Sequence, residues 1–211
     1  MTARLLVFAA LLCALPARGS DTPLDPAVRE ALTPIDAPPS KVLVDYAFRG
    51  SSGVDRLISL ASDSSIDAAV QIRAIRMLPL YCPQPDVGCA RTTVHDALVE
   101  LVQGYLTALR QTPAITLSAP DLLRLRAAVE ALGATHSAMS SDVDVLTQDP
   151  RALLRHPSRD VRVTVVRALR SLRSCAAIEP LRMLMTSETN TRVQPAIRSA
   201  LQNLESPGSC S

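Results

Sequence analysis

The side chains of this 211-residue chain that could do chemistry are few, and their spacing does not match that of an enzyme. The three histidines, His95, His136 and His156, are never four residues apart, and no His-Glu-x-x-His run offers a metal site. No Gly-x-Ser-x-Gly motif supplies a nucleophile, and no Gly-rich loop with a lysine supplies a phosphate cradle. We therefore expect a protein that is not an enzyme and that uses no metal and no cofactor.

Four of the five cysteines are spaced for disulfide bonds rather than for zinc. Cys82, Cys89, Cys175 and Cys210 lack the paired short intervals of a zinc ribbon, and no histidine lies beside them. An even number of cysteines in an exported chain suggests disulfides. The pairing with the shortest loops joins Cys82 to Cys89 and Cys175 to Cys210, although the sequence alone does not fix it.

The fifth cysteine, Cys13, lies in an N-terminal segment typical of a secretory signal peptide. Arg4 precedes an apolar run over residues 5–12, and residues 16–19 are Pro-Ala-Arg-Gly. The run is too short to span a bilayer, so we expect cleavage near Gly19 and a periplasmic or secreted protein without a transmembrane span. Lipid attachment at Cys13 is not expected, because a bulky leucine precedes it.

The charge balance of the mature chain argues against nucleic acid as a partner. Removal of residues 1–19 would take two arginines and no acid from 22 basic residues, leaving 20 to face 20 acidic ones. A chain near neutrality lacks the field that attracts nucleic acid or an acidic membrane. With no Trp, two Phe and three Tyr, it also has few rings on which bases could stack.

Composition divides the remaining chain into three parts. Residues 20–50 carry five prolines and no long apolar period, so we expect an extended or partly disordered leader with at best one short helix near residues 27–32. Residues 51–205 have the apolar spacing of helices, with no competing strand alternation. Residues 206–211 form a short tail.

The apolar spacing of residues 51–205 predicts four antiparallel helix pairs. The breaks between the helices coincide with turn-forming clusters such as His156-Pro157-Ser158. The predicted ranges are 53–62 with 65–80, 91–111 with 119–133, 142–155 with 159–173, and 175–187 with 191–204.

An internal repeat supports this arrangement, because residues 158–172 match the segment 32 residues later at their apolar positions. The coinciding positions are Val161 and Val193, Val165 and Ile197, Ala168 and Ala200, Leu169 and Leu201, and Leu172 and Leu204. The same frame fits residues 64–78 and, more loosely, residues 121–135. The second helix of each pair is therefore the recurring unit.

Residues 152–172 resemble a HEAT repeat of the short bacterial kind found in phycobilisome lyases. In that family a turn with proline is followed by Asp-x-Val-Arg-like residues and a helix that carries Ala-Leu, and Asp160-Val161-Arg162 and Ala168-Leu169 occupy these places here. The next unit has Arg192-Val193-Gln194 instead, and residues 91–134 depart most from the pattern. The resemblance implies an all-α fold, a right-handed α-solenoid (a HEAT-like superhelix) of about four helix pairs.

The resemblance also implies a binding surface, because the second helices of HEAT pairs line a concave face. Seven arginines and a single acid, Asp160, lie between residues 151 and 173. Such a basic patch would suit an acidic peptide or protein. The candidate binding residues are Arg159, Arg162, Arg170, Arg173, Arg198, Arg73 and Arg76. The alternative is that Arg162 pairs with Asp160 or with an acid of a neighbouring repeat, and that the other arginines only solvate their helix.

These observations favour a non-enzymatic protein-interaction scaffold of the cell envelope, which would bind an unknown protein through the Arg-bearing face. An alternative is a structural or assembly accessory of an envelope complex that binds through the Pro-rich leader. A lyase-like enzyme is a remote third hypothesis, against which the missing catalytic cluster weighs.

Overall fold

Helices are the only regular elements in the part of the chain that the structure describes, as the apolar spacing predicts. The structure, a computed structural model, describes residues 24–33, 40–49, 53–82, 89, 92–111, 117–147 and 153–210. The predicted signal segment, with Cys13, lies outside the described residues. The α-helices are α1 (Pro26–Leu32), α2 (Lys41–Ala47), α3 (Gly53–Ser62), α4 (Ala68–Met77), α5 (Thr93–Gln111), α6 (Ala119–Gly133), α7 (Ser140–Thr147), α8 (Arg159–Leu172), α9 (Ile178–Ser187) and α10 (Val193–Leu204).

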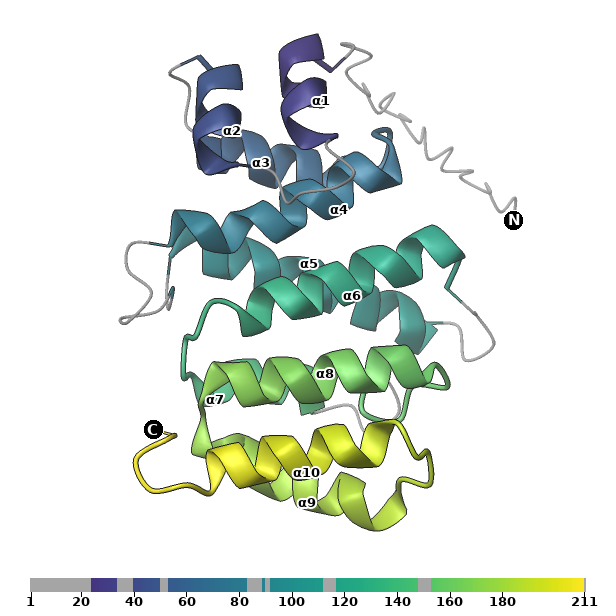
Figure 1. The fold of residues 1–211 in the computed structure, drawn as a ribbon. Helices are drawn as coiled ribbons and strands as arrows, with labels where there is room; N and C mark the ends of the chain where they lie inside the picture. The colour runs from purple at the N-terminus through teal and green to yellow at the C-terminus, as the bar shows by residue number, and fades with distance from the viewer. Residues whose placement is uncertain are drawn as a thin grey trace, which may run out of the picture.

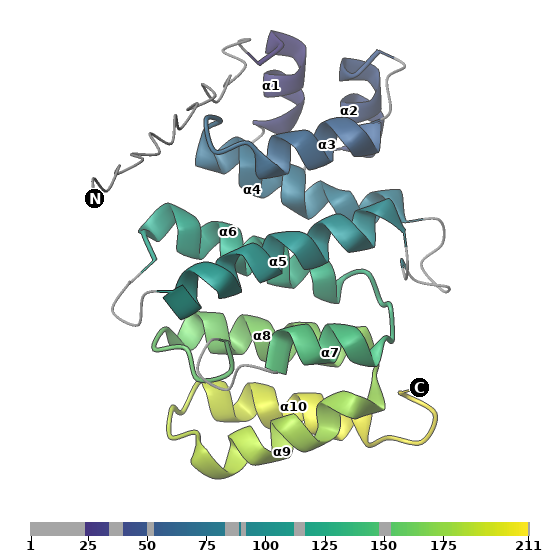
Figure 2. The same ribbon diagram turned by 180° about the vertical axis from the view of Figure 1, so that it is seen from behind.

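Helices α3 to α10 are stacked as pairs in two layers (Figure 1). The second helices of the pairs, α4, α6, α8 and α10, lie side by side in one layer, with α6 packed on α4 and α8, and α8 on α10. The first helices, α3, α5, α7 and α9, form the other layer, which faces the viewer in Figure 2. Helices α1 and α2 pack on each other and lie across the α3–α4 end of the stack.

Local chemistry explains where several helices begin. The carboxylates of Asp25 and Asp67 accept hydrogen bonds from the backbone N–H two residues later, both at 2.8 Å, and so cap α1 and α4. Pro26 opens α1, where a missing N–H costs nothing. The Ser118 hydroxyl caps α6 by accepting the N–H of Asp121.

Two expectations about helices need correction. The described parts of residues 20–50 form two helices, α1 and α2, where at most one was expected. These short helices are stabilised by burial of Leu32 in α1 and Val44 in α2, which are 0% and 1% exposed. The predicted helix 142–155 ends early, since α7 stops at Thr147 and the described residues 153–155 form a turn. Pro150 lies between these segments in the sequence, and proline cannot donate the hydrogen bond that a helix interior needs.

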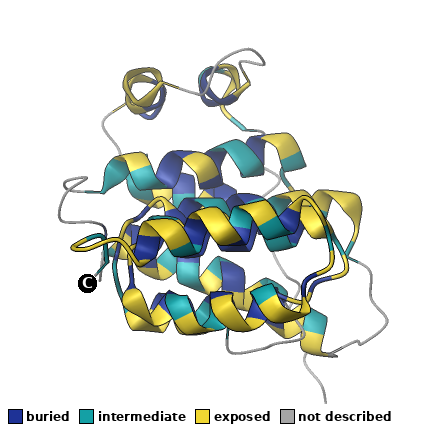
Figure 3. Cartoon of the chain, turned by 60° about the horizontal axis from the view of Figure 1, so that its bottom comes forward, coloured by how far each residue is buried: buried dark blue, intermediate teal, exposed yellow. Residues whose placement is uncertain are grey.

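The repeated apolar stripe forms the core between the two layers. All five positions predicted for α8 are buried, namely Val161, Val165, Ala168, Leu169 and Leu172. In Figure 3 the buried residues lie on the helix faces turned toward neighbouring helices, and the exposed residues lie on the outer faces. At the tightest contact, a Cβ added to Gly133 would lie 2.6 Å from the Ala168 Cα atom. A glycine at the end of α6 thus lets α6 and α8 approach closely.

The cysteines pair as the loop lengths predict. Cys82 and Cys89 are joined, and so are Cys175 and Cys210, with Sγ atoms 2.01 Å and 1.98 Å apart. The first pair connects the end of the α3–α4 pair to the start of α5, and the Cys89 N–H also donates to the Thr135 carbonyl at 2.9 Å. The second pair ties the start of the α9–α10 pair to the chain that follows α10. The two disulfides therefore fasten different parts of the stack.

We predict that removing the two disulfides will have unequal effects on stability. Closing a loop of 35 residues limits the unfolded chain more than closing one of 7, by about 4 against about 2.5 kcal/mol at most. The Cys175→Ser/Cys210→Ser variant should therefore lose more free energy of unfolding in urea than the Cys82→Ser/Cys89→Ser variant. Equal losses would contradict the loop-length explanation.

Candidate functional site

Five arginines gather on the outer side of the layer formed by α6, α8 and α10. They line two adjoining hollows of about 320 and 240 Å³, which share Val163, Arg167 and Arg192. The single acid among the described lining residues is Asp160. We call this surface the arginine face, and its arginines are Arg126 of α6, Arg159, Arg167 and Arg170 of α8, and Arg192 at the start of α10.

The guanidinium groups of the arginine face have weak partners or none within the described residues. Arg126 and Arg170 donate to the hydroxyls of Thr164 and Ser199 at 3.4 Å, which is a long hydrogen bond. Arg159 lies 3.5 Å from Asp160 in an exposed pair. Arg167 and Arg192 are exposed and make no side-chain hydrogen bond to described residues. Most of the donor capacity of this surface is thus left for a ligand.

Of the seven arginines predicted from the sequence, the structure places two, Arg159 and Arg170, on the arginine face. Arg73 donates to the carbonyl of Leu32 at 2.8 Å and so binds α1 to α4. Arg76 pairs with Glu130 of α6 at 3.1 Å. Arg173 ends α8 in the left-handed conformation, and Arg198 is exposed, but neither lines the two hollows.

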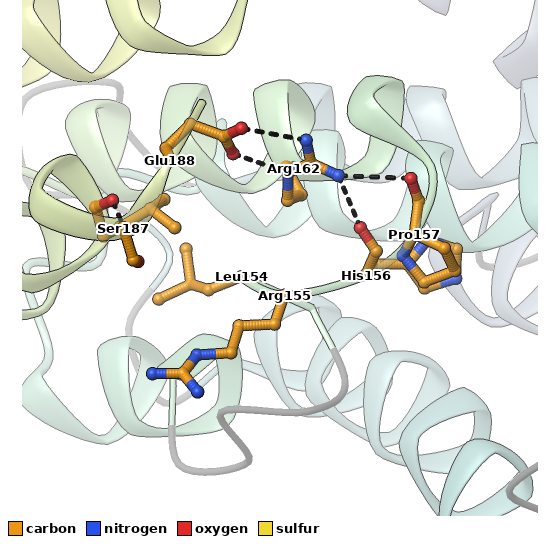
Figure 4. Close-up of a pocket in the computed structure, with 8 residues that line it drawn as sticks. Leu154, Arg155, His156, Pro157, Arg162, Ser187 and Glu188 are labelled. Carbon is orange, nitrogen blue, oxygen red and sulfur yellow. Dashed lines mark hydrogen bonds and ion pairs between the residues drawn. The ribbon is translucent and has the colours of Figure 1, made fainter. Parts of the chain in front are cut away.

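Arg162, the remaining predicted residue, is a structural link between the last two helix pairs. Its Nε and Nη2 atoms donate to the two carboxylate oxygens of Glu188 at 2.7 and 3.1 Å, and Nη1 donates to the carbonyl of His156 at 2.7 Å (Figure 4). The side chains of Arg162 and Glu188 are 14% and 5% exposed. This is the alternative in which Arg162 pairs with an acid of the neighbouring repeat.

The charge state of this link follows from its contacts. Burial alone would raise the pKa of Glu188, but the hydrogen bonds from Arg162 and from the Asn190 backbone outweigh it, and the pKa lies below its usual value. Burial, followed by the nearby Arg162 charge, lowers the pKa of His156. The ring of His156 stays neutral at pH 7, and its Nδ1 accepts the Ser158 N–H at 3.1 Å. These groups occupy one wall of a hollow of about 330 Å³ that Arg155 also lines.

Arg162→Ala should destabilise the protein by about 3–5 kcal/mol, because it leaves the buried Glu188 carboxylate without its charged partner. Arg159→Ala on the same helix is the matched control. Its exposed pair with Asp160 predicts a loss of at most about 1 kcal/mol. Urea unfolding at pH 7 measures both, and similar losses for the two variants would show that the link carries no special stability.

Three arginines of the arginine face were not predicted from the sequence: Arg126, Arg167 and Arg192. Arg167 occupies the outer ridge of α8 between the two hollows, three residues before Arg170. A helical wheel of α8 could have paired Arg167 with Arg170. Arg126 and Arg192 reach the same surface from α6 and α10, and their proximity depends on how the helices pack.

A buried polar cluster joins α5 to α7. His95 Nε2 lies 2.9 Å from Asp142 Oδ1, and the Ser137 hydroxyl donates to the same carboxylate. Both His95 and Asp142 are buried, at 5% and 1% exposed. Ser137 donates to the acid and not to the imidazole, so the cluster lacks the nucleophile–base contact of a serine hydrolase.

We predict that the His95 pair stabilises the fold more in acid than in base. Burial alone would lower the pKa of His95, but the hydrogen bonds with Asp96 and Asp142 outweigh it, and the pKa is raised above 6.5. The pair therefore contributes fully below about pH 6.5 and loses its contribution as pH rises through the raised pKa.

His95→Ala should cost about 3 kcal/mol at pH 6, because Asp142 remains buried without its cation. The difference in free energy of unfolding between this variant and wild type should become smaller toward pH 9. Urea unfolding at several pH values between 6 and 9 measures it. Since His156 is present in both proteins, its titration cancels. A difference that is constant with pH would contradict the raised pKa.

The described residues contain no group of three or more His, Cys, Asp and Glu side chains that could hold a metal ion. No described helix is both long enough and apolar enough to cross a bilayer.

A comparison with protein families identifies the class to which part of this chain is similar. The family model described as HEAT repeats matches residues 114–202, a range that contains α6 to α9, most of α10 and every arginine of the arginine face. The match supports the HEAT-repeat family for this part of the chain. Searches of the curated proteins and of the solved structures found no significant match.

Proposed function

We propose that this protein is a non-enzymatic binding scaffold that holds an acidic segment of a partner protein on the arginine face. The observation that carries the proposal is the imbalance of charge, because five guanidinium groups and one carboxylate line the two adjoining hollows. Arginine binds carboxylates through two parallel hydrogen bonds, so an Asp- or Glu-rich segment suits this surface. Within the described residues, the five arginines have long contacts or none, so binding a ligand would break few internal hydrogen bonds or ion pairs.

The proposal includes the arrangement and the compartment of the protein. Helix pairs that stack in register favour a right-handed α-solenoid of the HEAT type, whose sequence pattern resembles the short bacterial repeats of phycobilisome lyases. The two disulfides are compatible with an oxidising compartment, and the Arg4-led apolar run favours export to the periplasm or the medium.

An accessory role through the leader remains the second candidate, because α2 presents an apolar surface. Val42, Leu43 and Tyr46 are 75%, 54% and 82% exposed on one short helix. The opposite side of α2, which carries Val44 and Ala47, is buried. The Tyr81 hydroxyl also donates to Asp45 at 2.7 Å and so links α2 to the stack. Exposed apolar residues that adjoin one another favour contact with a partner.

The arginine face predicts tight, salt-dependent binding of acidic peptides. Fluorescence anisotropy with a labelled deca-glutamate peptide should give an affinity that falls as salt is added. The Arg167→Glu/Arg170→Glu/Arg192→Glu variant should bind at least tenfold more weakly. The control Arg29→Glu/Arg56→Glu/Arg155→Glu changes net charge equally at exposed sites off the arginine face and should bind nearly as wild type does.

If the two triple variants lost affinity for the peptide equally, net charge alone would explain the binding, and the proposal would be contradicted. Pull-down from envelope extract with the same variants then separates the two candidate functions. A partner lost by the arginine-face variant, and kept by Val42→Ser/Leu43→Ser/Tyr46→Ser, supports the arginine face. The reverse pattern supports the leader.

A further inference from the structure

Another hollow, larger than the three described above, opens among α3, α5 and the start of α6. Its volume is about 530 Å³. Apolar side chains of α3 and α5, including Ile58, Leu101 and Tyr105, line it together with Leu117, which precedes α6. Because α3 and α5 belong to the layer that faces the viewer in Figure 2, this groove is separate from the arginine face. We call it the α3–α5–α6 groove.

Two polar atoms of residues that line this groove are buried and have no hydrogen-bond partner among the described residues. One is the Oε1 acceptor of Gln71, a residue that is 2% exposed, and the other is the Nε donor of Arg124. Other atoms of these side chains do have partners, since Gln71 Nε2 donates to the Asp63 carbonyl and Arg124 Nη1 donates to Asp121. Leaving such an atom unpaired costs about 1–3 kcal/mol, so these atoms are unusual in a folded core.

Gly104 provides an independent reason to regard the groove as a site. It lies in the middle of α5, where glycine destabilises a helix by about 1 kcal/mol relative to alanine. A Cβ at this position would have no heavy atom within 4 Å, so close packing does not require glycine. Gly104 is exposed and lines the groove, so the groove is open at this position.

We propose that the α3–α5–α6 groove binds a short apolar segment of a partner polypeptide, with an apolar side chain over Gly104 and backbone groups paired to Gln71 and Arg124. Both atoms are covered in the unbound protein. On binding, the two side chains would turn toward the groove, so that a backbone N–H donates to Gln71 Oε1 and a backbone carbonyl accepts from Arg124 Nε. The groove thus recognises an apolar peptide, while the arginine face recognises acidic residues.

The unpaired atoms select a peptide over other apolar ligands. A hydrocarbon chain satisfies neither atom, and a fatty acid carboxylate supplies acceptors but no donor for Gln71. A polypeptide carries both a donor and an acceptor at each residue, next to side chains that fill apolar space. Binding sites of this kind are mostly apolar, with a few polar groups that fix orientation.

The experiment uses the capped peptide acetyl-Ala-Leu-Leu-Ala-amide and amide chemical shifts of the full chain. We expect saturable shifts that localise to α3, α5 and the start of α6. The same peptide with N-methylated leucines lacks N–H donors and should bind at least threefold more weakly, as should acetyl-Ala-Gly-Gly-Ala-amide, which lacks the apolar side chains. Decanoate tests the lipid alternative.

The variants Gly104→Leu and Gly104→Ala distinguish an effect on peptide binding from an effect on the stability of the fold. Both should raise or preserve the melting temperature, because each improves helix propensity where space is open. Gly104→Leu should weaken peptide binding at least tenfold by filling the groove, whereas the arginine-face triple variant should bind the peptide as wild type does.

Absence of binding up to the solubility limit of the leucine peptide would overturn the proposal. So would shifts outside the groove, an affinity unaffected by Gly104→Leu, or decanoate binding at the same residues as tightly as the leucine peptide. Failure of the arginine face to bind deca-glutamate would leave this inference standing, because the two sites share no residues.

Discussion

The packing of the second helices against one another is the interaction on which the rest of the structure depends. Helix α8 illustrates it, because its apolar residues are buried by α6 on one side, α10 on the other and α7 beneath. Burial of each such Val or Leu contributes about 1.5–3 kcal/mol, which no isolated helix of this length can obtain. The arginine face exists because this packing brings three helices into one surface.

The parts of the fold that could be predicted from the sequence are those encoded by the spacing of apolar residues within a single helix. The pairing of α3 to α10 and the buried stripe of α8 follow from spacing within single helices. Helix α2 could not be predicted in this way, because its seven residues lack a long period and its stability depends on contacts with α1 and on Asp45 with Tyr81. Short helices that rely on tertiary contacts leave little trace in the sequence pattern.

The candidate site was less predictable because arginines on one helix serve different purposes. Arg162 and Arg170 are similar in the sequence, but Arg162 is partly buried and paired with Glu188, whereas Arg170 is exposed to solvent. The distinction arises from a residue 26 positions away, which no helical wheel of α8 contains. Arg126 and Arg192 could not be predicted from α8 either, because they lie in α6 and at the start of α10, and only the packing of adjacent helices brings them to this surface.

The Cys175–Cys210 disulfide has a mechanical consequence. Tension applied to the chain beyond Cys210 would pass through the two sulfur atoms to Cys175 and would bypass the backbone between them. Helices α9 and α10, with the Arg192 guanidinium, therefore lie outside the path of force. A partner that pulls on this end of the chain would strain the earlier helix pairs first, while the last pair keeps its shape as long as the disulfide is intact.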